Sequence, residues 1–283
     1  IDIQMEGFKR IGVLADWEHP YKTMDPGFEA EEVKVFGEMY KKGYIYKGLK
    51  PVYWCPNDET ALAEAEIEYQ DDPCTTVYVK FQMKDDQGKL AAYDHSKLYF
   101  VIWTTTIWTL PGNLAIAVHP RESYVLVKAD NGALYIVAEA LCAKVMQAGG
   151  FDHYEIVKQF RGQDFEYMKA QHPFLDKESL LCCAEYVTMD SGTGCVHTAP
   201  GFGADDYETC KRYKVELVVP VDDQGRHTDY AGKYAGLKTE ESNPVILADL
   251  KESGALFASE EIVHSYCLLY TSPSPRDGLL YRM

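Results

Sequence analysis

Residues 1–70 combine one clear helical pattern with short strand-like runs. Asp25-Pro26 is a typical helix start, because aspartate accepts hydrogen bonds from free amides and proline fits the first helical position. Apolar residues then recur at helical spacing from Phe28 to Tyr40, and Gly43 is a suitable C-terminal cap. A helix is therefore predicted from Pro26 to just before Gly43, with strands over 50–55 and 61–69.

From Asp71-Asp72-Pro73 onward the pattern changes to the two-residue alternation of strands. Val77, Val79 and Phe81 would share one face, with Tyr78 on the other. Further strands are predicted over 98–106, 114–118, 124–128, 134–137, 186–188 and 194–197, with a hairpin turn at Asp130-Asn131-Gly132 and helices over 138–148 and 205–213. Many short strands with few helices predict an α+β, β-rich and barrel-like domain over residues 71–258.

Composition and charge narrow the class of protein without defining a function. The 283 residues are 46% hydrophobic and 25% charged, as in globular proteins. The net charge of -16 argues against non-specific coating of nucleic acid, although a local basic groove would still fit. The eight cysteines are irregularly spaced, which predicts reduced cytoplasmic thiols and no structural zinc site. No apolar stretch reaches the roughly 20 residues of a membrane helix, so no membrane is expected as a partner.

The first candidate site is the segment from Trp103 to Asn113. Three consecutive hydroxyls, Thr104 to Thr106, end a predicted strand shortly before a Pro-Gly-Asn turn. Hydroxyls and turn amides together can hold a ribose, a phosphate or a water molecule. Threonine is also a common strand former and Trp108 suits a core position, so the residues alone favour a structural role.

The second candidate site is the segment from Gly192 to Tyr207. Glycines surround a short strand, a Pro-Gly-x-Gly loop containing Gly201 follows, and acids begin a helix. Those acids could simply cap the helix, with His197 an ordinary loop histidine. Alternatively the loop lets backbone approach a ligand, and His197 and Asp206 converge on it, with an ionised Asp206 suited to an ammonium group. A serine nucleophile at Ser191 would lack the nucleophile-elbow sequence, and a zinc site would lack a third ligand.

Together and in this order, these segments resemble the class I synthetases for branched aliphatic amino acids. Residues 12–25 and 61–69 are similar to the isoleucyl type before and at the start of its editing insertion, and the two candidate segments resemble its two editing motifs. Valyl and leucyl enzymes usually carry arginine where Thr106 stands, which favours the isoleucyl type. The resemblance extends from residue 1 to about residue 267.

The resemblance implies a β-rich editing domain, residues 71–258, inserted in a truncated Rossmann-type α/β catalytic domain, residues 1–70 and 259–267. An isoleucine pocket rejects valine only weakly, because the missing methylene lowers the binding free energy by only about 1–3 kcal/mol. The isoleucyl enzymes are themselves the standard example of this limit. The editing domain would therefore hydrolyse wrongly charged Val-tRNA(Ile) and exclude Ile-tRNA(Ile). It would need no cofactor and no metal.

The resemblance also assigns roles to single residues. The expected catalytic residues are Thr104, Thr105, Thr106, His197 and Asp206, and the expected substrate-binding residues are Trp103, Thr109, Asn113 and Gly201. The three catalytic threonines with Asn113 would hold the terminal adenosine and position the attacking water. Asp206 would anchor the α-ammonium group, and His197 would line the pocket and exclude the larger side chain.

Three departures from the family pattern qualify this interpretation. Ile107 replaces the proline usual after the threonines, which could loosen that turn. Asn57-Asp58 replaces a second cysteine near Cys55. Residues 268–283, rich in proline and serine, match nothing in the family and are expected to be disordered or artefactual.

The chain begins with Ile1 and lacks both class I nucleotide signatures, so we expect an internal piece that cannot itself form an adenylate. The full-length enzyme would ligate isoleucine to tRNA(Ile) with ATP and Mg²⁺, as a monomer in the cytoplasm. The expected partners of this piece are the tRNA(Ile) 3′ end and an amino-acid ester. Two alternatives stay open: a tRNA-end-binding fragment without turnover, and a valyl- or leucyl-type editing domain.

Overall fold

The computed structural model describes residues 1–269 and 280–282, and it divides the chain into two compact units, Ile1–Leu49 and Lys50–Met283. The first unit consists of helices α1 (Asp2–Arg10) and α2 (Pro26–Lys41). The predicted helix is confirmed: Asp25 is its N-cap and Gly43 follows its end with a φ of 78°. Residues 1–49 contain no strand, so the Rossmann-type assignment of this part stays a prediction.

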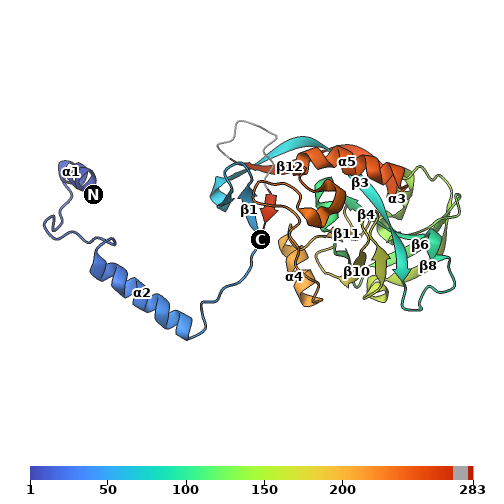
Figure 1. Cartoon of the computed structure of the whole chain (residues 1–283), viewed down its shortest axis with the longest axis horizontal. Helices are drawn as coiled ribbons and strands as arrows, with labels where there is room; N and C mark the ends of the chain where they lie inside the picture. Colours follow the sequence, from blue (N-terminus) through green and yellow to red (C-terminus); the bar gives the residue numbers. More distant parts are fainter. Residues whose placement is uncertain (270–279, 283) are drawn as a thin grey trace. The chain divides into compact units, whose positions relative to one another are not determined.

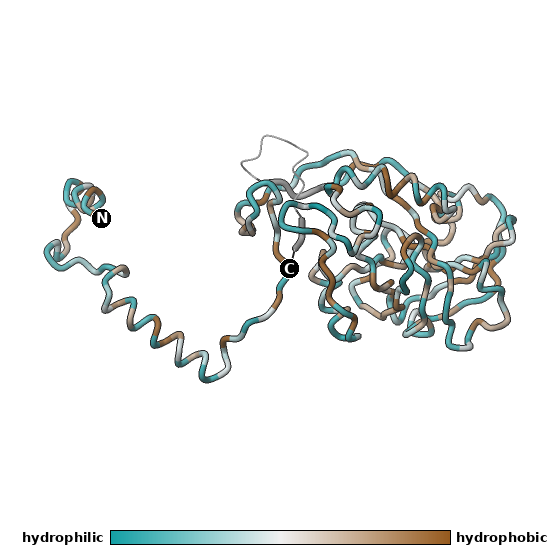
Figure 2. Tube along the Cα trace, viewed as in Figure 1, coloured by the Kyte–Doolittle hydropathy of each residue, from teal (hydrophilic) through white to brown (hydrophobic). Residues whose placement is uncertain are grey.

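Helix α2 exposes apolar side chains along its length. Phe36 and Tyr40 are 59% and 64% exposed, and Met39 is 42% exposed. Figure 2 shows hydrophobic positions interspersed with polar ones along this helix. Exposed apolar surface of this kind is typical of a segment that packs against further protein.

The second unit is built mainly from strands. Its strands are β1 (Val52–Cys55), β2 (Thr60–Leu62), β3 (Ile67–Asp85), β4 (Leu98–Thr104), β5 (Ala115–Val118), β6 (Ser123–Ala129), β7 (Leu134–Ala138), β8 (Tyr154–Arg161), β9 (Lys169–Gln171), β10 (Glu178–Cys183), β11 (Cys195–Thr198), β12 (Leu256–Leu269) and β13 (Leu280–Arg282). Its α-helices are α3 (Cys142–Ala148), α4 (Ala204–Arg212) and α5 (Thr239–Glu252). Its 3-10 turns are η1 (Glu64–Glu66), η2 (His95–Lys97), η3 (Ile107–Gly112), η4 (Glu139–Leu141), η5 (Gly162–Phe165) and η6 (Asp229–Tyr234).

Ten of these strands form one mixed sheet in the order β12-β3-β9-β10-β5-β11-β4-β7-β6-β8. Strand β3 pairs with β4 as well as with β9, so the sheet folds back on itself. Helix α5 packs against η3 and β12, as Figure 1 shows. The predicted β-rich α+β class is confirmed, and its barrel-like character takes the form of this curled sheet.

The first and last strands of the large sheet form a long antiparallel ribbon. Its register runs from Ile67↔Leu269 to Val79↔Leu256. The predicted domain limits at residues 71 and 258 both fall inside these two strands, and they stay predictions. The pairing does bring the two ends of the inserted segment together, as an insertion requires.

The core contains the residues of β3 that the predicted alternation places inside, and it contains Tyr78 as well. Val77, Val79 and Phe81 are fully buried. Tyr78, which was predicted to lie on the other face, is only 1% exposed, and its hydroxyl donates to a Glu260 carboxylate oxygen at 3.2 Å. Both faces of β3 are therefore covered over residues 76–79, whereas residues 68–71 at its start are exposed.

Two local predictions were wrong and one was confirmed in detail. Residues 61–69 do not form one strand, because Glu66 accepts the Ala63 amide hydrogen at 2.9 Å and closes the turn η1. Residues 186–188 form no strand. The hairpin between β6 and β7 is confirmed, with Gly132 at a φ of 79° and the Asn131 side chain accepting from the Ala133 amide at 2.9 Å.

The structure describes only some of residues 268–283, the segment that was predicted to be disordered. Leu268 and Leu269 continue β12, and Leu280–Arg282 form β13, which pairs with β1. Residues 270–279 and 283 lie outside the described residues. In the part of the chain that the structure describes, no helix is both long and apolar enough to cross a membrane.

Candidate functional site

The threonine-rich segment lies where β4 ends and η3 begins. The Thr104 hydroxyl oxygen accepts the Thr106 amide hydrogen at 3.1 Å, which turns the chain out of the strand. Thr105 and Thr106 are half-buried, and their hydroxyls lie 3.4 Å apart. Ile107 is buried and opens η3, so the turn forms without the proline usual at this position.

The glycine-rich segment enters the same region through strand β11. This strand is antiparallel to β5, and Val196 pairs with Trp103 at the end of β4. Gly194 has a φ of 76°, and a Cβ there would overlap the Ala138 side chain, so glycine is required. The two candidate segments are therefore neighbours in the sheet although about 90 residues separate them in sequence.

A buried hydrogen-bond network joins the two segments. The Thr109 hydroxyl lies 3.0 Å from His197 Nε2, and it donates to the Thr106 carbonyl oxygen at 2.8 Å. On the other side of the ring, Asn113 Nδ2 lies 2.7 Å from His197 Nδ1. Ser179 Oγ donates to Asn113 Oδ1 at 2.5 Å. We call Thr106, Thr109, Asn113, Ser179 and His197 the buried network.

The partners of the buried network determine the tautomer of His197. Asn113 Nδ2 also donates to the Ala115 carbonyl oxygen at 2.9 Å, so the amide group of Asn113 must point its NH₂ toward the ring. His197 Nδ1 is then an acceptor, and the ring proton is on Nε2, where it donates to Thr109. Burial, together with the charge of Lys177, lowers the pKa of His197 to about 3, so the imidazole is neutral at physiological pH.

Asp206 lies in the first turn of α4, close to the end of β11. Its Oδ2 accepts the Ala199 amide hydrogen at 2.9 Å, two residues after His197. Burial raises the pKa of Asp206 to about 6, because desolvation disfavours the carboxylate more than the Ala199 amide stabilises it. A buried carboxylate that lacks a cationic partner is well suited to receive one from a ligand.

The structure also places the predicted substrate-binding residues. Trp103 is half-buried and packs against Gly192. Asn113 is fully buried, and its amide is fully engaged in the buried network, so it supports His197 from within. Gly201 is buried, and a Cβ there would lie 2.6 Å from the Val218 carbonyl oxygen. The close approach that Gly201 permits is therefore to the protein's own backbone.

Three residues of this region were missed by the sequence prediction: His172, Lys177 and Ser179. His172 Nε2 donates to the Leu110 carbonyl oxygen at 2.9 Å, and Lys177 Nζ donates to the Pro111 carbonyl oxygen at 2.6 Å. The partners of His172 and Lys177 are main-chain carbonyl groups, which leave no residue pattern in the sequence. The one available signal was the pair Lys177 and Ser179 at strand spacing before the apolar run 180–183.

No metal chemistry is built into the described residues. Across residues 1–269 and 280–282 there is no group of three or more His, Cys, Asp or Glu side chains that could hold a metal ion. The cysteines described are free, and burial raises the pKa of Cys183 to about 11. The site thus offers hydroxyls, one neutral imidazole and one carboxylate.

Comparisons with known proteins show which family the chain belongs to. The family of class I tRNA synthetases (I, L, M and V) matches residues 1–182. The isoleucine–tRNA ligase of Caldicellulosiruptor saccharolyticus is 55% identical over 268 residues, which are 94% of this chain and 29% of that protein. The isoleucine–tRNA ligase of Thermoanaerobacter sp. is 51% identical over 277 residues, 97% of this chain and 30% of that protein.

The chain thus spans about 29% of the length of the curated relatives it matches. Among solved structures, the editing domain of the P. knowlesi cytosolic leucyl-tRNA synthetase has a TM-score of 0.53 at 10% identity, and covers 69% of this chain and 98% of that one. At this identity the likeness concerns the fold alone. The predicted resemblance to the isoleucyl enzymes is confirmed by the curated relatives, and the chain belongs to the class I tRNA synthetases that serve isoleucine, leucine, methionine and valine.

Proposed function

We propose that the unit beginning at Lys50 is a hydrolytic editing domain that cleaves Val-tRNA(Ile). The observation that carries the proposal is the buried network, which joins the hydroxyls of one candidate segment to His197 of the other. Residues about 90 positions apart meet in this hydrogen-bonded arrangement, and Asp206 accepts the amide hydrogen of Ala199, two residues after His197. Asp206 also closes the loop before α4 through the Ala199 amide, and no ion pair of the described residues includes its carboxylate, so a cationic group of a ligand would pair with it.

Asp206 would bind the α-ammonium group of the aminoacyl ester. With a pKa raised to about 6 by burial, its carboxylate is nevertheless largely ionised at neutral pH. An ammonium group would form a charge-assisted hydrogen bond with it and remove part of the desolvation cost. This role fixes the amino acid relative to the hydroxyls of Thr104, Thr105 and Thr106.

Hydrolysis would proceed by attack of a positioned water on the ester carbonyl carbon. The bond between that carbon and the ribose oxygen breaks, the ribose oxygen takes up a proton, and the products are a free amino acid and an uncharged tRNA 3′ end. The hydroxyls of the threonine-rich segment would orient the water and donate to the developing oxyanion. His197 would not act as the base, because its Nδ1 lone pair accepts from Asn113, its Nε2 proton is directed at Thr109, and burial lowers its pKa to about 3.

Selectivity would come from the size of the space beside His197. The ring is held from both sides by Thr109 and Asn113, so it cannot swing aside without breaking two buried hydrogen bonds. A rigid wall can reject the additional methylene of isoleucine and accept valine. In the full-length protein, a synthetic site outside this chain would use ATP and Mg²⁺ to ligate isoleucine to tRNA(Ile) in the cytoplasm.

The test is deacylation of Val-tRNA(Ile) and Ile-tRNA(Ile) by this chain. We expect faster release of valine than of isoleucine, and loss of this activity in Asp206→Ala. Asp205→Ala is the matched control, because Asp205 is the exposed neighbour on the same helix turn. Equal rates for both esters would contradict the proposal. Binding of the tRNA end without turnover would instead indicate a non-catalytic fragment, and a preference for threonyl or leucyl-type substrates would indicate a valyl- or leucyl-type editor.

A further inference from the structure

Residues 172–179, here called the support segment, hold the backbone and side chains of residues 110–113. Three hydrogen bonds make this contact: His172 Nε2 to the Leu110 carbonyl oxygen at 2.9 Å, Lys177 Nζ to the Pro111 carbonyl oxygen at 2.6 Å, and Ser179 Oγ to Asn113 Oδ1 at 2.5 Å. The second half of η3 and the residue that follows it are therefore fastened at three points. Neither the threonine-rich nor the glycine-rich segment contributes these donors.

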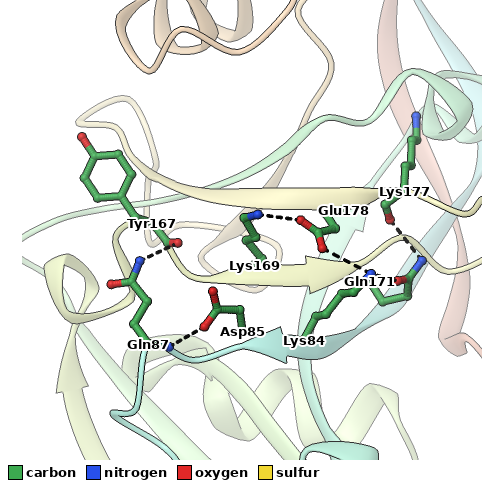
Figure 3. A network of polar contacts seen from close by, with 8 residues as sticks. All are labelled: Lys84, Asp85, Gln87, Tyr167, Lys169, Gln171, Lys177 and Glu178. Carbon is green, nitrogen blue, oxygen red and sulfur yellow. Dashed lines mark hydrogen bonds and ion pairs between the residues drawn. The ribbon is translucent and has the colours of Figure 1, made fainter.

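The support segment is itself anchored on its opposite face. Glu178 forms ion pairs with Lys169 at 2.7 Å and with Lys84 at 3.2 Å, and Gln171 Nε2 donates to the Lys177 carbonyl oxygen at 3.1 Å. Figure 3 shows these contacts, with the Lys177 side chain directed away from the Glu178 carboxylate. Because side chains alternate along an extended chain, Lys177 and Ser179 face the site while Glu178 faces this exposed network.

Ser179 controls which way the Asn113 amide points. An asparagine amide can rotate by half a turn and exchange its donor and acceptor ends. In that rotated state the oxygen would face His197 Nδ1, and the ring could bond to it only with its proton on Nδ1. The rotation would turn the Asn113 oxygen toward the Ala115 carbonyl oxygen, and it would take away the oxygen that accepts the Ser179 hydroxyl proton, so both groups oppose it. Ser179 is fully buried, so no water replaces it.

Lys177 adds a positive charge beside the two buried histidines. Its ammonium group lies 4.8 Å from the centre of the Tyr230 ring, and burial lowers its pKa to about 8. The titratable groups that act on His197 are Lys177 and the adjacent His172, whose pKa is lowered to about 3 by burial and by Lys177. The other atoms that contact the His197 ring belong to Thr109 and Asn113, which carry no charge.

We propose that Ser179 is a positioning residue of the editing site, which holds the Asn113 amide so that the proton of His197 stays on Nε2 and the ring donates to Thr109. The Thr109 hydroxyl must then donate to the Thr106 carbonyl oxygen, so the direction of every hydrogen bond in the buried network is set from the support segment. The inference deepens the proposed function and rests on it for its catalytic meaning. The protonation state itself can be measured without any tRNA.

The experiment is nitrogen–proton correlation spectroscopy of this chain labelled with ¹⁵N-histidine, recorded between about pH 5 and 8, the range in which an ordinary histidine titrates. His197→Gln identifies the resonances of His197. The wild-type chain should show only the neutral, Nε2-protonated ring over the whole range. Ser179→Ala should add a population with the proton on Nδ1.

Each outcome distinguishes the inference from the proposed function. A single Nε2-protonated ring in Ser179→Ala would refute the positioning role even if the chain deacylates Val-tRNA(Ile). The expected spectra in a chain that deacylates neither ester would refute the editing function alone. Should Ser179→Ala fail to fold, Ser179→Cys, which is close to serine in size but is only a weak donor, takes its place and should show the same second population.

Discussion

Replacing Asp206 by asparagine should stabilise the protein while abolishing editing. The carboxyl has an ordinary pKa of 3.8, and burial raises it to about 6 in the folded chain. The folded state therefore binds the proton more tightly, so stability falls as the pH rises from 3.8 through 6. A difference of about 2 pKa units corresponds to roughly 3 kcal/mol, of which ~0.8 kcal/mol is lost between pH 5.5 and 7.5. Asparagine carries no charge and can still accept the Ala199 amide hydrogen.

The assay is urea unfolding of the wild type and Asp206→Asn at several pH values above the isoelectric point of about 4.9. The stability gain of Asp206→Asn should approach roughly 3 kcal/mol at pH 7.5 and be smaller by ~0.8 kcal/mol at pH 5.5. Asp205→Asn, at the exposed neighbouring position, should change stability by no more than about 0.5 kcal/mol. A gain that does not vary with pH, or a loss of stability at every pH, would show that the folded structure does not strain this carboxylate.

Three further outcomes are expected. Thr109→Val leaves the buried Nε2 proton of His197 without an acceptor, and urea unfolding should show a loss of about 1–3 kcal/mol with slower deacylation. Gly194→Ala should lose about 2–4 kcal/mol in the same assay, whereas Gly132→Ala, at a similar φ but with open space around it, should lose only about 1 kcal/mol. The kcat/KM of deacylation should rise with pH to a plateau above about 6 as Asp206 ionises, and this inflection should vanish in Asp206→Asn.

The elements that the sequence predicts best are those fixed by neighbours in the chain. Pro26 starts α2, and Asn131-Gly132 closes the hairpin between β6 and β7, because both signals act within a few residues. The stretch 61–69 was predicted as one strand because its charges alternate, but a local carboxylate–amide hydrogen bond closes a turn there. The pairing of β3 with β12 joins residues nearly 190 positions apart, and no local pattern contains that information.

The candidate site likewise contains residues that the sequence indicates and residues that it does not. Thr106, Thr109 and His197 stand out in the sequence because hydroxyls and glycines cluster around them, and the structure joins them. The roles assigned to single residues stay predictions. His172 and Lys177 could not be found, because they bind carbonyl oxygens that every residue type possesses. Asn113 was predicted to bind substrate, which stays a prediction, and only packing shows that both ends of its amide are taken up inside the protein.

The long ribbon of β3 and β12 has a consequence for any enzyme that carries this unit. A flexible loop of about 190 residues would cost its host roughly 5 kcal/mol of loop-closure entropy when its ends are brought together. Here the register Ile67↔Leu269 fixes the ends side by side through the unit's own strand pairing. For the host domain, the insertion is therefore equivalent to a short loop. The folding rate and the stability of the host domain need not decrease as the inserted unit becomes longer.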